Sequence, residues 1–171
     1  MVNRDVSALL IGHEHHIRGS ILTDGRRLLE ILNAKTTDYL EVNNARVFRR
    51  DAAEECIAKL STVVVTKVSI SLIVVIEEKH EAPERRLHAF TPKVRYPVFL
   101  TLPGHEVAGK IHLTYAPDAK AVLARDTDDF FPLTDAVVAR ANSVGSLKAN
   151  VVMVNKAHLG LFYINPSPVT T

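Results

Sequence analysis

Apolar residues come in short runs that are separated by turn signals, a pattern typical of strands. Residues 6–11 form one such run, and residues 16–23 alternate loosely between apolar and polar positions. Residues 39–49 alternate as well. Residues 62–77 are too long for one flat strand, so we expect a bent strand or two strands broken near Lys67.

The second part of the chain repeats this kind of pattern. Pro103-Gly104 is a turn signal between two alternating runs and predicts a hairpin. A strand should begin at Phe130, and residues 147–164 should form a last pair of strands. The strands of this hairpin are expected at residues 96–102 and 106–113.

Two segments have the spacing of short helices. Residues 26–33 follow the turn signal Asp24-Gly25 and should end near Asn33, in the left-handed conformation that closes many helices. Residues 116–125 follow a helix-start signal. Residues 49–60 fit either a short helix or a long hairpin excursion, and Asn43-Asn44 fits a β-bulge.

Three segments recur in the same order at nearly constant spacing. Residues 39–47 align with 130–138 at an offset of 91, residues 65–70 with 154–159 at 89, and residues 17–21 with 107–111 at 90. Two units of roughly 80 residues indicate a duplicated small domain and not a solenoid. The alternative is that valine-rich strands resemble one another by composition.

The predicted fold is therefore mainly β, with two tandem small five-stranded bent-sheet barrels and short helical turns. Each half reads as a hairpin, a helical turn, a strand, a loop and a long bent strand pair. Charges crowd the segment between the halves, which predicts a linker. The expected divisions are residues 1–78 (first barrel repeat), 79–90 (charged linker), 91–165 (second barrel repeat) and 166–171 (flexible tail).

Composition changes this picture little. The 171 residues are 47% hydrophobic and 23% charged, with a net charge of +2, so no global field attracts nucleic acid or a membrane. The single cysteine, Cys56, excludes an intrachain disulfide. We see no targeting segment, and the longest apolar run, residues 68–76, is far shorter than the ~20 residues that span a bilayer. A cytoplasmic protein without membrane insertion is expected.

Four short motifs resemble an uncharacterised bacterial family of small β-barrel domains. They are RRLLEILN (26–33), YLEVNNARV (39–47), FFPLTDAVV (130–138) and VNKAHL (154–159). The second half lacks the Leu-Asn turn, and the first half has TKVSI where the family has a histidine. Residues 98–113 are also similar to the first hairpin of Sm-like domains, but no Asp-x-x-Met-Asn loop for RNA is present. The resemblance implies tandem Sm-like or SH3-like barrels of unknown function.

Histidines and basic residues are the candidates for chemistry. Imidazoles suit zinc, copper or nickel, so His13, His15 and His16 are a weak metal-site hypothesis; a solvated or pH-sensitive turn is the alternative. A second group could form an interaction edge or contact nucleic acid, although charged flanks that protect strand edges are the commoner explanation for such residues. This group comprises Arg46, Arg49, Arg50, Lys67, Arg140, Lys156 and His158.

The sequence contains no Ser-His-Asp arrangement, nucleophile elbow or phosphate-binding glycine loop, and no cofactor is indicated. The leading hypothesis is a non-enzymatic protein–protein interaction or assembly module that self-associates or docks on a larger complex. Its partner would be a protein, most simply further copies in a homo-oligomer. An Sm-like regulator that binds single-stranded nucleic acid is the first alternative, and a metal-binding protein that uses the histidine turn is the second.

Overall fold

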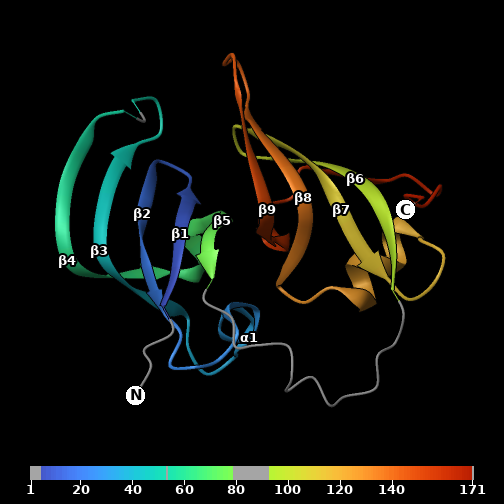
Figure 1. Ribbon diagram of the computed structural model, residues 1–171, viewed down its shortest axis with the longest axis horizontal. Coiled ribbons are helices and arrows are strands. Elements are labelled where there is room, and N and C mark those ends of the chain that lie inside the picture. Colours follow the sequence, from blue (N-terminus) through green and yellow to red (C-terminus); the bar gives the residue numbers. More distant parts are fainter. Residues whose placement is uncertain (1–4, 53, 79–92, 171) are drawn as a thin grey trace.

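A computed structural model describes residues 5–52, 54–78 and 93–170. The first half contains five strands and two helical turns, in the order expected from its apolar pattern (Figure 1). These elements are β1 (Asp5–Gly12), β2 (His15–Leu22), α1 (Leu28–Asn33), β3 (Tyr39–Arg49), β4 (Cys56–Thr66), η1 (Lys67–Ser69) and β5 (Ile70–Glu78).

The second half has the same order of elements. They are β6 (Val94–Leu102), β7 (His105–Leu113), α2 (Ala119–Ala121), η3 (Val122–Asp126), β8 (Phe130–Arg140), β9 (Ser146–Asn155), η4 (Lys156–His158) and β10 (Leu161–Ile164). The expected charged linker, residues 79–90, lies outside the described residues. The end of the chain, expected to be a flexible tail, follows β6: the backbone N–H of Val169 donates to the carbonyl of Arg95.

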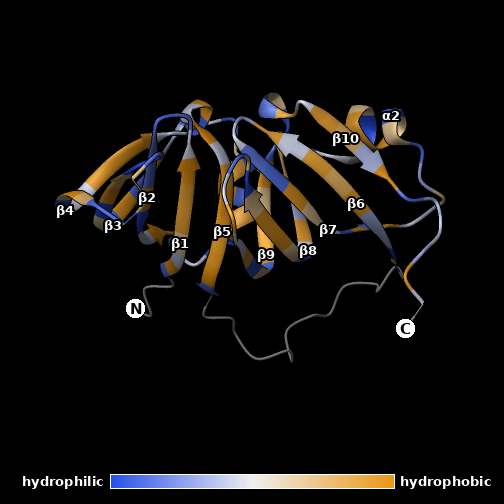
Figure 2. Ribbon diagram, turned by 90° about the horizontal axis from the view of Figure 1, so that it is seen from above, coloured by the Kyte–Doolittle hydropathy of each residue, from blue (hydrophilic) through white to orange (hydrophobic). Residues whose placement is uncertain are grey.

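All of these strands belong to one antiparallel sheet in the order β10-β6-β7-β8-β9-β5-β1-β2-β3-β4. The mainly β class is thus confirmed. The sheet is continuous and does not close, where two separate small barrels were expected, because β5 pairs with β1 on one side and with β9 on the other. Each half curls (Figure 1), and a view from above shows the sheet running from β4 at one end to β6 and β10 at the other (Figure 2).

Matching β-bulges bend the two halves. Asn44 and Asp135 are backbone equivalents with φ of 51° and 47°, the left-handed region that asparagine and aspartate tolerate. The register of each strand pair shifts opposite them, at Gly19 and at Gly109. A Cβ on Gly19 would lie 2.7 Å from the carbonyl oxygen of Asn43, so the close approach requires glycine. The bulge expected at Asn43-Asn44 is confirmed.

The segment around Lys67 behaves as one of the two predicted alternatives. β4 ends at Thr66, a single 3₁₀ turn follows, and β5 begins at Ile70. Residues 49–60 form a β-hairpin between β3 and β4 instead of a helix. Pairing of Val47 with Ala58 and of Phe48 with Cys56 carries the strands almost to the turn.

A lysine closes the helical turn of each half, and it is buried in the first half and half-buried in the second. The Nζ of Lys67 donates to the carbonyls of Ile31, Ala34 and Thr37 at 2.7, 3.0 and 2.7 Å. In the second half, Lys156 donates to the carbonyls of residues 123 and 127 at 3.0 and 2.9 Å. The last carbonyls of a helix have no partner within it, so a cation satisfies them and their negative partial charge. Burial lowers the pKa of Lys67 because desolvation disfavours the ammonium ion.

The end of α1 departs from the prediction. Asn33 does not adopt a left-handed conformation, and the residue after it, Ala34, is extended with φ of −64°. The side chain of Asn33 is used elsewhere, as described below. Lys67 takes over the capping of the helix end, so a left-handed residue is not needed there.

Replacement of Lys67 by methionine should lower the free energy of unfolding by about 2 kcal/mol, because it leaves buried carbonyls without partners while keeping the apolar stem. Urea titration measures the change. Lys120→Met, on an exposed position of α2, is the matched control and should change the midpoint little. Equal midpoints for the two variants would contradict a capping role for Lys67.

Candidate functional site: the inner junction and the two open edges

The two halves join where β5 pairs with β9. Leu72, Ile73 and Val74 lie opposite Val154, Met153 and Val152. All six side chains are buried, so both faces of both strands are covered. This explains why the sequence here is an almost continuous apolar run and not an alternating one.

The junction exchanges side chains between two cores. Leu72 and Val74 point into the core of the second half, whereas Ile73 points into that of the first. In return, Phe130 and Met153 of the second half pack into the first core. Because successive residues of a strand face opposite sides, one strand can serve both cores.

Side-chain amides clamp this junction. The amide of Asn33 donates to the carbonyl of Phe130 at 2.9 Å and accepts from its backbone N–H at 2.8 Å. Asn155 donates to the carbonyl of Ile70 at 2.8 Å. The Nε2 of His158 lies 2.8 Å from the carbonyl oxygen of Val68 and donates to it. These bonds connect segments that are about 90 positions apart in the chain, and they fix the register of the halves.

The open edge at β4 presents the counterparts of buried junction residues. Val64 aligns with Met153; Val64 is 62% exposed and Met153 only 6%. Tyr39, at the start of β3, aligns with Phe130 and is about half exposed, whereas Phe130 is buried. The difference arises because β9 has β5 beside it and β4 has no neighbour on its outer side among the described residues.

The open edge at β10 presents the counterparts of buried residues of β5. By register along β6 and β1, Leu161 and Tyr163 are the counterparts of Leu72 and Val74. Leu161 is half exposed and Tyr163 is 53% exposed, whereas their counterparts are buried in the neighbouring half. The amide clamps are not repeated: Thr66 stands where β9 has Asn155, and residues 122–126 contain no asparagine.

The structure does not bring the predicted metal ligands together. His13 and His15 are exposed, whereas His16 is buried and its ring centroid lies 5.6 Å from that of His105. Within the described ranges, no three His, Cys, Asp or Glu side chains are placed to hold a metal ion. Adjacent strand residues face opposite sides, which separates His15 from His16.

His16 is the most perturbed titratable group of this region. Burial lowers its pKa from 6.5 to about 4, and the neighbouring His105, Arg140 and Arg50 lower it further in the same direction. Burial also lowers the pKa of His105, against a hydrogen bond to the carbonyl of Pro103 that raises it. The Nε2 of His16 is buried and has no hydrogen-bond partner in the part of the chain that the structure describes.

The predicted basic group divides among three places. Lys67, Lys156 and His158 serve the helical turns and the inner junction, as described above. Arg50 and Arg140 lie between the halves, and Arg140 donates to the carbonyl of Arg50. The guanidinium of Arg50 donates to the carbonyl of His13 and occupies the space that a Cβ on Gly104 would need. Arg46 and Arg49 are exposed on β3. These residues form no single basic face, and nucleic-acid binding stays a prediction.

The edge residues Tyr39, Val64, Leu161 and Tyr163 were not among the predicted site residues. The internal alignment held part of the signal, since it places Tyr39 over Phe130. Their exposure could not follow from it, because exposure depends on which strand ends the sheet. No helix in the described segments is long and apolar enough to cross a membrane.

Acid should destabilise the fold through His16. Its folded pKa of about 4 lies below the ordinary 6.5, so the unfolded chain binds the proton more readily between these values. The contribution of His16 to the free energy of unfolding is fully present above pH 6.5 and is lost as the pH is lowered toward 4. At pH 5 the loss from this group is roughly 2 kcal/mol. Urea titrations at pH 7 and pH 5 measure the loss.

The variant His16→Gln should show a smaller loss between pH 7 and pH 5. His15→Gln, at the exposed neighbouring position, is the control and should lose as much as the parent protein. A parent-like loss in His16→Gln would show that other groups are responsible.

Comparison with models of known families, with curated proteins and with solved structures gives no significant match.

Proposed function

We propose that the protein is a non-enzymatic assembly module whose copies join head to tail, with β4 of one copy alongside β10 of the next. The observation that carries the proposal is the exposure of Tyr39 and Val64 at one edge and of Leu161 and Tyr163 at the other. These positions match the side chains that the inner junction buries. A neighbouring copy would bury them in the same way.

The backbone of β4 is suited to such pairing. It is 11 residues long, carries β-branched residues at Thr62 to Thr66, and contains one charged residue, Lys59. Natural proteins usually shorten or charge an open edge strand, because its unpaired N–H and C=O groups are a template for another strand. A long edge with so little charge is therefore best explained by a partner strand.

The resemblance between the halves supports a duplicated small Sm-like barrel as the origin of the chain. Both halves have the same order of elements, a left-handed bulge residue at equivalent places and a lysine that caps the helical turn. Such units would have joined edge to edge before they became one chain. The inner junction would then be a covalently linked version of the contact proposed between copies.

Contacts between copies should be weaker than the inner junction. They would keep the packing of apolar side chains from one unit into the core of the next, but they would lack the hydrogen bonds of Asn33, Asn155 and His158. A head-to-tail contact is heterologous, so it generates a ring if the rotation closes and an open chain if it does not. We expect reversible association that depends on protein concentration.

Charged substitutions at either edge should abolish association. Val64→Lys and Tyr163→Lys each place a desolvated ammonium ion in the proposed contact, which is strongly unfavourable. Light scattering after size exclusion should give monomers of 18.9 kDa for both variants. Val144→Lys is the matched control, because Val144 is fully exposed in the turn between β8 and β9 and away from both edges.

A mixture of the two variants distinguishes head-to-tail pairing from a two-fold symmetric contact. Val64→Lys keeps an intact β10 edge and Tyr163→Lys an intact β4 edge, so the mixture should form a dimer with one of each. A symmetric β4–β4 contact would instead be lost in Val64→Lys alone. A parent protein that is monomeric at high concentration would refute the proposal.

A further inference from the structure

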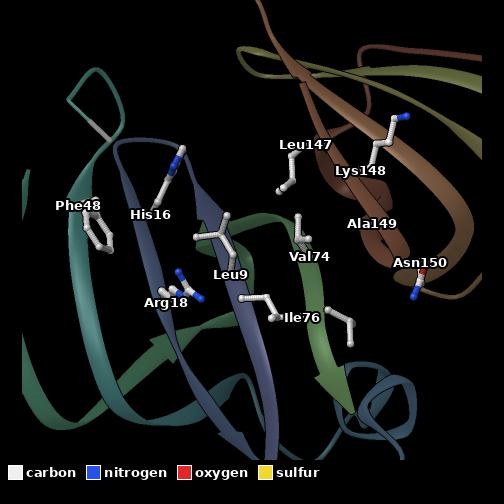
Figure 3. Close-up of a pocket in the computed structure, with 11 residues that line it drawn as sticks. Leu9, His16, Arg18, Phe48, Val74, Ile76, Leu147, Lys148, Ala149 and Asn150 are labelled. Carbon is white, nitrogen blue, oxygen red and sulfur yellow. The ribbon is translucent and has the colours of Figure 1, made fainter. Parts of the chain in front are cut away.

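A cleft of about 500 Å³ lies between the two halves, away from both open edges (Figure 3). Its floor is the outer face of the first half's sheet, opposite to the face that holds the first core. The beginning of β9 forms its other wall. Its lining residues come from β1, β2, the end of β3, β5 and β9.

The register of the strands sets the floor. Leu9 lies between Val74 of β5 and Arg18 of β2, and the row beside it runs from Leu72 through Ile11 to His16. Apolar side chains thus occupy the β5 side of the floor and nitrogen-bearing side chains the β2 side. Figure 3 shows Leu9, Val74 and Ile76 on one side of the opening and Lys148 and Asn150 on the wall across from them.

The charges of the cleft are all of one sign. Arg18 and Lys148 line it, and no carboxylate of a described residue does. Arg46 lies directly opposite Arg18 in the β2–β3 pair, and none of these three cations makes an ion pair with a described residue. Like charges directly opposite each other destabilise a strand pair, and a bound anion would offset this repulsion.

His16 adds an independent sign of a ligand. Its side chain lines the cleft, the residue is 6% exposed, and its Nε2 has no hydrogen-bond partner among the described residues. Buried polar atoms are nearly always satisfied, and an unsatisfied one costs about 1–3 kcal/mol. A neutral imidazole that carries its proton on Nε2 can donate a hydrogen bond to an anion.

We propose that this cleft binds a small organic carboxylate with an apolar body, such as a medium-chain or aryl carboxylate. The apolar body would lie on Leu9 and Ile76, and the carboxylate would face Arg18 and Lys148 with His16 as a further donor. The volume falls within the range of small-molecule sites, and the lining combines apolar side chains with a few polar ones, as such sites do. Charge-assisted bonds to the carboxylate supply the preference for an acid over a neutral ligand.

Octanoate is the probe, and octanol of equal chain length is its uncharged control. A titration of the ¹⁵N-labelled full chain followed by NMR should show saturable shifts at the amides of Leu9, Val74 and Ile76. Arg18→Gln and Lys148→Gln should each weaken octanoate binding about tenfold, which corresponds to one charge-assisted bond. Octanol should bind far more weakly than octanoate to the parent protein.

Arg125→Gln, an exposed position on η3, is the matched control and should bind octanoate as the parent protein does. Val64→Lys should also bind normally, because neither β4 nor β10 lines the cleft. The binding site therefore stands or falls separately from the head-to-tail assembly. No saturable shifts, equal binding of octanol, or unchanged affinity in both cleft variants would overturn the proposal.

Discussion

The pairing of β5 with β9 is the constraint on which the rest of the structure depends. If β5 paired with β1 alone, Leu72 and Val74 would lie on the outside of the first half, and Phe130 and Met153 would lose their packing in the first core. Strand alternation lets β5 supply both cores at once. Neither half can therefore separate without exposing apolar surface of the other, and the chain should unfold as one cooperative unit.

Local sequence signals predicted most of the elements, because strands, turns and bulges depend on neighbouring residues. Asp24-Gly25, Asn44 and Pro103-Gly104 each have a conformational preference that short-range sterics set. The function of Lys67 was not predictable in this way, since its three acceptors lie 30 to 36 positions away. The predicted left-handed helix end at Asn33 was wrong for the same reason: the side-chain amide of Asn33 forms a hydrogen bond to Phe130, which lies in the other half.

The exposed residues of the two open edges could not be predicted from the sequence, because they resemble their buried counterparts. Tyr39 and Phe130, or Val64 and Met153, are apolar residues at equivalent positions, and nothing in their own segments indicates which is buried. Burial is decided by the order of strands in the sheet, which is a long-range property. His16 is a comparable case, because its neighbour His105 belongs to the opposite half.

The amide clamps fix the register of strand pairing at the junction within the chain, whereas the register at the outer edges is not fixed in this way. A slip of one residue in strand pairing turns every side chain to the other face, so a junction between two cores needs a fixed register. Asn33 supplies it by bonding both backbone groups of Phe130. The outer edges have no such clamp, and β10, with four residues, is much shorter than β4, with 11. Register between copies would therefore depend on the fit of Tyr39 and Val64 against Leu161 and Tyr163, which makes side-chain shape and not backbone pairing the source of specificity at those edges.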